Sequence, residues 1–198
     1  MNDTIQRYNK IAIILHGMVG LLLLAMFVLG FWMHDLPKEL KVESLDLFNL
    51  GVYTVTFQEP TSLRTFYFNL HKSIGVTVLA LIMFRLYWRL THAAPAFPAT
   101  MKNWEKKLAD AVHKGLYALM LAMPLSGVLM ATYSKYGILW FGIPLVAGLD
   151  NAGMREMFKE AHEMIGAVLL LLIVLHVAAA IKHKVIDKDD VMKRMSLH

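Results

Sequence analysis

Two histidines, His162 and His176, occupy the last long apolar stretch of the chain, residues 161–181. Fourteen residues of helix rise about 21 Å and turn about 1400°, within roughly 40° of a whole number of turns, so both imidazoles face the same way. An ionisable side chain inside a bilayer is costly, and metal ligation is a common reason for a histidine there. The spacing is too long for one ion but suits two haems stacked across a membrane, each with one axial imidazole from this helix.

Each histidine taken alone has a simpler interpretation. A histidine on a membrane helix can hydrogen-bond a neighbouring helix or line a water-filled cavity. The haem hypothesis depends on the shared spacing and on partners at matching depths, which the other helices are predicted to supply.

The composition is that of a helical membrane protein. Of 198 residues, 57% are hydrophobic and 18% are charged, and the apolar residues form long continuous runs rather than the short alternating segments of a barrel. The chain has no cysteine, which excludes disulfides, iron–sulfur clusters, thiolate catalysis and covalent c-type haem. No basic block interleaved with aromatic residues indicates nucleic-acid binding.

Four apolar segments predict an all-α membrane protein, a four-transmembrane-helix bundle. The first could pass for a signal peptide, but it is about 23 residues long and lacks a small-x-small cleavage site, so we expect it to be retained. The short alternating piece GVYTVTF could form a strand or hairpin, and MREMFKEAHEMI is expected to continue into the last helix. The predicted helices span about 11–33, 66–90, 108–132 and 161–182 of a single domain, 1–198.

The distribution of cations predicts the orientation. Lys and Arg number two before the first helix, five in 85–107 and five in 182–198. The connections 34–66 and 132–163 hold three each, offset by five and four acids. By the positive-inside rule, both termini are predicted to be cytoplasmic.

This topology pairs the histidines by depth. His16, near the start of the first helix, and His176, near the end of the last, are both expected toward the cytoplasm. His71 and His162 are both expected near the outer face. The prediction is therefore two bis-histidine haem sites, an inner one and an outer one.

Two further histidines leave alternatives open. His113 also lies at the cytoplasmic end and is the second choice for the inner ligand, although a hydrogen bond to a haem propionate or a neighbouring helix is the simpler role. His183 lies seven residues beyond His176, on nearly the same stripe and about 10 Å further along. It is a candidate proton donor for a quinone, whereas the simpler interpretation is a polar helix end that faces water.

Cations at both ends are candidates for pairing with haem propionates. At the inner end, lysines and arginines are expected in any case, because they snorkel to the interface. At the outer end lysines and arginines are less expected. There they could also steer a small anion or an acidic protein toward the outer haem site. The inner candidates are Arg85, Arg89, Lys182 and Lys184, and the outer candidates are Arg64, Lys72, Arg155 and Lys159.

Other chemistry has little support. AHEMIG lacks the second histidine of HExxH, and there is no P-loop or dinucleotide fingerprint. No carboxylate lies in the central turns of a predicted membrane helix, and Asp110 lies near an interface, which disfavours a proton-driven transporter.

Several motifs together resemble the bacterial cytochrome b561 family of four-helix dihaem membrane proteins, over nearly the whole chain. They are ILHG in the first helix, LHKSIG and FRLYWR in the second, VHKGLYALMLAMPLSG in the third, and AHEMIGAVLLLLIVLH followed by KHK in the fourth. The resemblance implies haem ligation by His16, His71, His162 and His176, and it places His183 near a proposed quinone site.

The function that we expect is electron transfer by two haems b in the bacterial inner membrane, as a multi-pass protein. Some members of the family resemble superoxide oxidases, which pass electrons from superoxide at the outer face to ubiquinone, so a superoxide:ubiquinone oxidoreductase is the first hypothesis. The alternative is a cytochrome b subunit for a periplasmic redox enzyme or hydrogenase, since the connection between the first two helices is long. A haem-free transporter or scaffold subunit is the alternative of another class.

Overall fold

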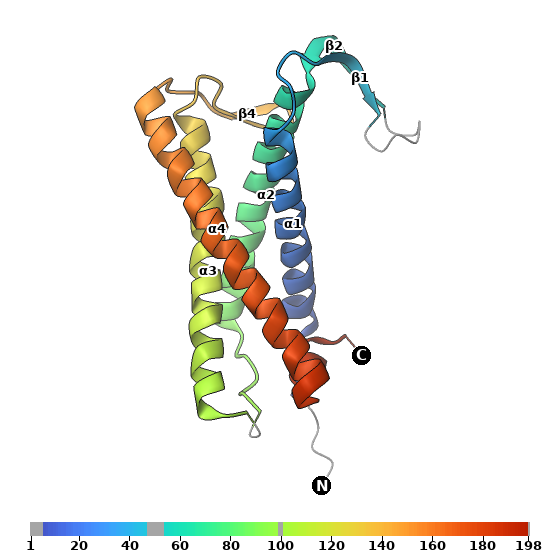
Figure 1. Cartoon of the computed structure of the whole chain (residues 1–198), viewed down its shortest axis with the longest axis vertical. Helices are drawn as coiled ribbons and strands as arrows, with labels where there is room; N and C mark the ends of the chain where they lie inside the picture. The colour runs from blue at the N-terminus through green and yellow to red at the C-terminus, as the bar shows by residue number, and fades with distance from the viewer. Residues whose placement is uncertain (1–5, 47–53, 99–100, 198) are drawn as a thin grey trace.

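Four long helices form the body of the molecule (Figure 1). The computed structural model describes residues 6–46, 54–98 and 101–197. Every one of the four helices is long and apolar enough to cross a membrane, which confirms the predicted bundle. That the chain forms a single domain stays a prediction. The helices are α1 (Lys10–His34), α2 (Leu63–Thr91), α3 (Asn103–Thr132) and α4 (Ala152–Lys182).

Helix α4 is longer than its apolar run. It begins at Ala152, where the Asn151 side chain accepts a hydrogen bond from the Met154 N–H at 3.1 Å and caps the helix. MREMFKEAHEMI is thus part of α4, as predicted. Beyond Lys182 the helix widens into a π-helical turn, η1 (His183–Asp187), and a short 3₁₀ helix, η2 (Met192–Met195), follows.

Two small hairpins lie at one end of the bundle, the hairpin end (Figure 1). In the first, β1 (Lys41–Asp46) pairs antiparallel with β2 (Thr54–Ser62) between α1 and α2. Of the predicted strand GVYTVTF, residues 54–57 lie in β2, and 51–53 lie outside the described residues. In the second, β3 (Ile138–Trp140) pairs with β4 (Ile143–Val146) between α3 and α4.

The β3–β4 hairpin is bonded to the side of α2. Ser73 Oγ accepts the Phe141 N–H at 3.0 Å. Its hydroxyl lies near two carbonyls, that of Asn69 in its own helix at 2.8 Å and that of Leu139 in the hairpin at 3.1 Å. One turn further along α2, Thr77 Oγ1 accepts the Trp140 indole N–H at 3.1 Å. Backbone groups of the hairpin thus have polar partners on α2.

A band of aliphatic side chains holds the helices together. Val19, Ile82 and Leu169 are the largest fully buried side chains and come from α1, α2 and α4. On α4, Leu169 lies midway between His162 and His176. Outward-facing apolar residues such as Leu21 stay 70% exposed, as expected for a surface that contacts lipid.

The N-terminal and C-terminal segments meet at the opposite end, the termini end. The Tyr8 N–H donates to the Arg194 carbonyl at 3.0 Å, and Arg194 Nη1 donates to the Ala96 carbonyl in the α2–α3 connection. Both chain ends therefore lie on one side of the bundle, as an even number of crossings requires (Figure 1).

We predict that this side is the cytoplasm, from the excess of Lys and Arg there. Green fluorescent protein fused after His198 should fluoresce in cells, and alkaline phosphatase at the same position should be inactive. As a control, alkaline phosphatase inserted into the β1–β2 connection should be active. The reverse pattern at both positions would contradict the predicted orientation.

Candidate functional site

Three histidines meet at the termini end of the bundle. His16 of α1 and His176 of α4 have ring centroids 5.9 Å apart, with an interplanar angle of 66°. His113 of α3 lies on another side of the same ring, 5.4 Å from His176 at an angle of 68°. The structure thus brings the predicted inner pair together, and it brings the second-choice residue equally close.

Both of these pairs have the spacing for one metal. With metal–nitrogen bonds of about 2 Å, two imidazoles on one metal place their ring centres roughly 6 Å apart. Ring distance alone therefore does not choose between His16 and His113 as the partner of His176. The hydrogen bonds of the rings carry more information.

Arg85 of α2 contacts the His16 ring directly. One guanidinium nitrogen lies 2.7 Å from Nδ1 of His16, and the guanidinium also lies over the Tyr117 ring, 5.5 Å from its centre. Because arginine is a donor only, His16 Nδ1 accepts, and the neutral ring carries its proton on Nε2. Ligation through Nε2 would need the proton on Nδ1, so Arg85 and the metal require opposite tautomers of His16.

At the hairpin end, His162 of α4 has the other tautomer. Its Nδ1 lies 3.0 Å from the Met123 carbonyl and 3.0 Å from Ser126 Oγ, both on α3. The carbonyl only accepts, and Ser126 Oγ already donates to it at 2.8 Å, so Nδ1 is the donor to both. The lone pair of Nε2 is then available, which is the arrangement of a metal-ligating histidine with a second hydrogen-bonded nitrogen.

His71 of α2 lies at the same end of the bundle, beside Gly30 of α1. His71 Nδ1 is buried and has no hydrogen-bond partner among the described residues. A buried, unpaired ring nitrogen is uncommon, and a propionate or a metal is a partner of the right chemistry for it.

Two glycines make room for the rings at the hairpin end. A Cβ added at Gly30 of α1 would lie 3.5 Å from Cε1 of His71, an ordinary contact distance. A Cβ added at Gly127 of α3 would lie 3.1 Å from Cε1 of His162, so that ring would have to move. Gly127 therefore sets how closely α3 can approach the His162 ring.

His183 is buried at the start of η1, with 8% of its surface exposed. Its Nδ1 lies 2.7 Å from Asp189 Oδ2 and 3.2 Å from Asp187 Oδ2. It thus pairs with carboxylates and does not face bulk water. The sequence prediction missed both aspartates, although the run DKDD shortly after KHK was a visible signal.

The predicted cations have varied partners. Arg85 alone among them bonds a histidine ring, and the charge of Arg89 acts on His113. At the hairpin end, Arg64 donates to the Leu36 carbonyl at 3.2 Å, and Lys72 donates to the Gly137 carbonyl at 3.1 Å. The others lie near carboxylates or a cavity: Arg155 pairs with Glu156, Lys159 with Glu156 and Glu163, Lys182 with Glu105 and Asp187, and Lys184 lines a cavity beside η2.

Comparison with known proteins identifies the family of this four-helix chain. The family model of the prokaryotic cytochrome b561 matches residues 7–196, which include all four helices. Cytochrome b561 homolog 2 of Escherichia coli (strain K12) is 30% identical, covering 98% of this chain and 93% of its own length. Cytochrome b561 homolog 1 of the same organism is 30% identical over 63% of this chain and 72% of its own length.

A third relative carries a more specific name. The probable superoxide oxidase CybB of Yersinia pestis is 27% identical, over 69% of this chain and 78% of its own length. The family implies haem b binding and electron transfer, and the four spanning helices make the protein multi-pass. The chain is a member of the prokaryotic cytochrome b561 family.

Proposed function

We propose that the chain holds two haems b and carries single electrons between a donor at the hairpin end and ubiquinone at the termini end, in the bacterial inner membrane. The observation that supports this most is the pair of rings at the termini end, His16 with His176. At the hairpin end the support is the buried Nδ1 of His71, without a partner in the described part of the chain, and the hydrogen bond that leaves His162 Nε2 available. Membership of a cytochrome family disfavours the alternative of a haem-free transporter or scaffold.

When bound, each haem supplies one-electron iron chemistry whose potential depends on axial ligands, burial and nearby hydrogen bonds. The chain's own part is orientation. The Met123 carbonyl and Ser126 hold His162 with Nε2 available, so the hairpin-end ligand is preorganised.

At the termini end, Arg85 has two competing partners. A haem propionate would suit its planar guanidinium, and pairing with it would free His16 Nδ1 to carry the proton. His16 and His176 would then be the residues that hold this haem, His16 through Nε2. If Arg85 kept its hydrogen bond to His16, His113 would be the better partner of His176. Among the described contacts, no hydrogen bond to a ring nitrogen of His113 opposes ligation.

The first candidate donor is superoxide. Two superoxide anions each lose one electron to become dioxygen, and ubiquinone takes up those two electrons and two protons to become ubiquinol. Support comes from the similarity to a probable superoxide oxidase and from Arg64 and Lys72, which have no carboxylate partner among the described ion pairs. Arg155 and Lys159 are weaker candidates for attracting an anion, because they pair with Glu156.

A specific observation favours the second candidate, a cytochrome subunit for a periplasmic redox enzyme. The β1–β2 hairpin projects from the hairpin end of the bundle, and most of its residues are exposed (Figure 1). A projecting sheet edge can pair with a strand of a partner protein. The electron donor would then be a docked protein instead of superoxide.

Haem content tests the ligand assignment. We expect about two haems b per purified wild-type chain, and about one in His71→Ala, in His162→Ala and in the double variant, because those two residues share one site. His16→Ala should also fall to about one, whereas His113→Ala should keep about two. Pyridine haemochrome assays with reduced-minus-oxidised spectra measure this. Loss of a haem in His113→Ala with retention in His16→Ala would reassign the termini-end ligand.

The approach of α3 to His162 gives a second prediction. Gly127→Ala should shift the midpoint potential of one haem, by tens of millivolts in rough magnitude, because the added Cβ displaces the ligand ring. Gly30→Ala is the matched control, since its Cβ meets His71 at an ordinary distance. Redox titration followed in the visible spectrum measures both. Equal shifts in the two variants would contradict the role of Gly127.

Activity with superoxide separates the two candidate functions. Purified protein with a soluble ubiquinone should convert superoxide to ubiquinol, and His162→Ala should slow this by at least about tenfold. Superoxide dismutase should abolish ubiquinol formation. Normal haem content without superoxide-dependent ubiquinol formation would exclude the first candidate and leave the docked redox enzyme.

A further inference from the structure

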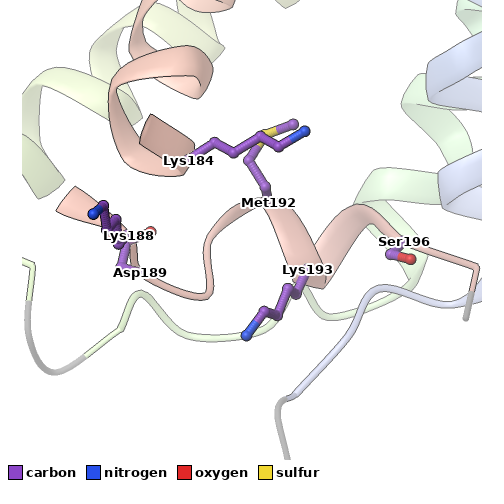
Figure 2. A pocket seen from close by; sticks show the side chains of 6 residues that line it. All are labelled: Lys184, Lys188, Asp189, Met192, Lys193 and Ser196. Carbon is purple, nitrogen blue, oxygen red and sulfur yellow. The ribbon is translucent and has the colours of Figure 1, made fainter. Parts of the chain in front are cut away.

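A cavity lies outside the histidine sites, where the chain turns after α4. Residue Lys188 adopts a left-handed conformation, with φ of 52°, and directs the chain from η1 back toward η2. The turn borders an open surface cavity of about 370 Å³ (Figure 2). Its lining residues are Lys184, Lys188, Asp189, Met192, Lys193 and Ser196.

The lining of this cavity is cationic. Lys184 from η1 and Lys188 from the turn have no carboxylate within 4.0 Å among the described residues, and Figure 2 shows them at different parts of the rim. Lys193 pairs with Asp190 at 2.7 Å. The one lining carboxylate, Asp189, is already bonded to the His183 ring and to the Val191 N–H. Two lysines without a described carboxylate within 4.0 Å therefore border a space large enough for a small anion.

The surroundings of the cavity are apolar and exposed. Val185 and Ile186 follow Lys184 directly and are 59% and 73% exposed, and Ile181 in the preceding turn is 56% exposed. These side chains continue the apolar surface of α4, a helix that is long and apolar enough to span the membrane. Lysines next to exposed aliphatic residues at a helix end suit a lipid, whose headgroup and acyl chains need both surfaces.

The segment that closes the cavity is attached to the rest of the bundle. Arg194, in η2, bonds the Ala96 carbonyl of the α2–α3 connection, and its own carbonyl accepts from Tyr8 before α1. On the other side, Lys182 bridges Asp187 of η1 and Glu105 of α3, at 2.6 and 3.0 Å. The cavity is thus held between two anchored segments.

We propose that this cavity binds the phosphate headgroup of an anionic phospholipid. Lys184 and Lys188 pair with the phosphate, Lys193 and Ser196 line its polar side, and the acyl chains lie along Ile181 and Val185, which adjoin Lys184 on the helix surface. A free phosphate ion offers the same charge but would leave those aliphatic side chains in water, which favours the lipid as the source. The bound lipid would connect the end of α4 to η2, next to His183.

Binding of phosphatidylglycerol to the full-length, delipidated holoprotein tests the proposal. Titrations followed by native mass spectrometry give the affinity for the first bound lipid. Lys184→Gln/Lys188→Gln should weaken it roughly 10- to 30-fold, since each basic residue at a membrane surface contributes a similar factor. Binding of zwitterionic phosphatidylcholine should be weak and unchanged.

Lys106→Gln/Lys107→Gln is the matched control. It removes two lysines from the start of α3, at the same end, and neither has a carboxylate partner among the described ion pairs. This control and Lys184→Arg/Lys188→Arg should bind phosphatidylglycerol as the wild type does. Unchanged haem spectra and far-ultraviolet circular dichroism report that each variant is folded.

Three outcomes would overturn the proposal. Equal affinity of the Lys184→Gln/Lys188→Gln variant and the wild type would show that the cavity is not the site. Equal weakening in the Lys106→Gln/Lys107→Gln control would show a general surface charge effect. Displacement of phosphatidylglycerol by an equal concentration of inorganic phosphate would show that the site takes a free anion.

Discussion

The position of one proton governs what each histidine can do. A neutral imidazole offers one donor and one acceptor, and in an apolar bundle neither is easily left unmatched. At His162 the Met123 carbonyl takes the donor and leaves the acceptor available. That carbonyl lies beside the ring because α3 packs closely on α4, which Gly127 permits. The contact between two helix backbones is therefore what gives this histidine the properties of a ligand.

The two ends of the bundle differ in this respect. At His16 the nearest polar group is the Arg85 guanidinium, which can only donate and which favours the opposite tautomer. In the proposed assignment His162 already has its Nε2 available, whereas His16 would need an exchange of hydrogen-bond partners. It follows that cofactor insertion at the termini end should be coupled to movement of Arg85, and that His113 competes with His16 only at this end.

The sequence was sufficient for the helices, because hydropathy determines them. A rise of about 1.5 Å per residue also predicted that His16 and His176 lie at one level, and their rings are in contact. It could not distinguish His16 from His113, since that depends on how α1 and α3 are placed around His176. The sequence analysis also placed His183 on the same face of the helix as His176. In the structure the helix widens into η1 at His183, and its ring pairs with Asp187 and Asp189. Long-range contacts such as Ser73 with Phe141 have no local signal at all.

The polar groups of the two ends suit the two halves of the proposed reaction. Oxidation of superoxide releases an electron and dioxygen and requires no proton, and the β3–β4 hairpin that covers α2 has no titratable side chain. Reduction of ubiquinone consumes two protons, so it requires titratable groups that connect to water. At the termini end His183, Asp187 and Asp189 are linked to one another, and Asp187 is partly exposed. In the proposed reaction these three side chains are the candidates for passing protons from water to the quinone.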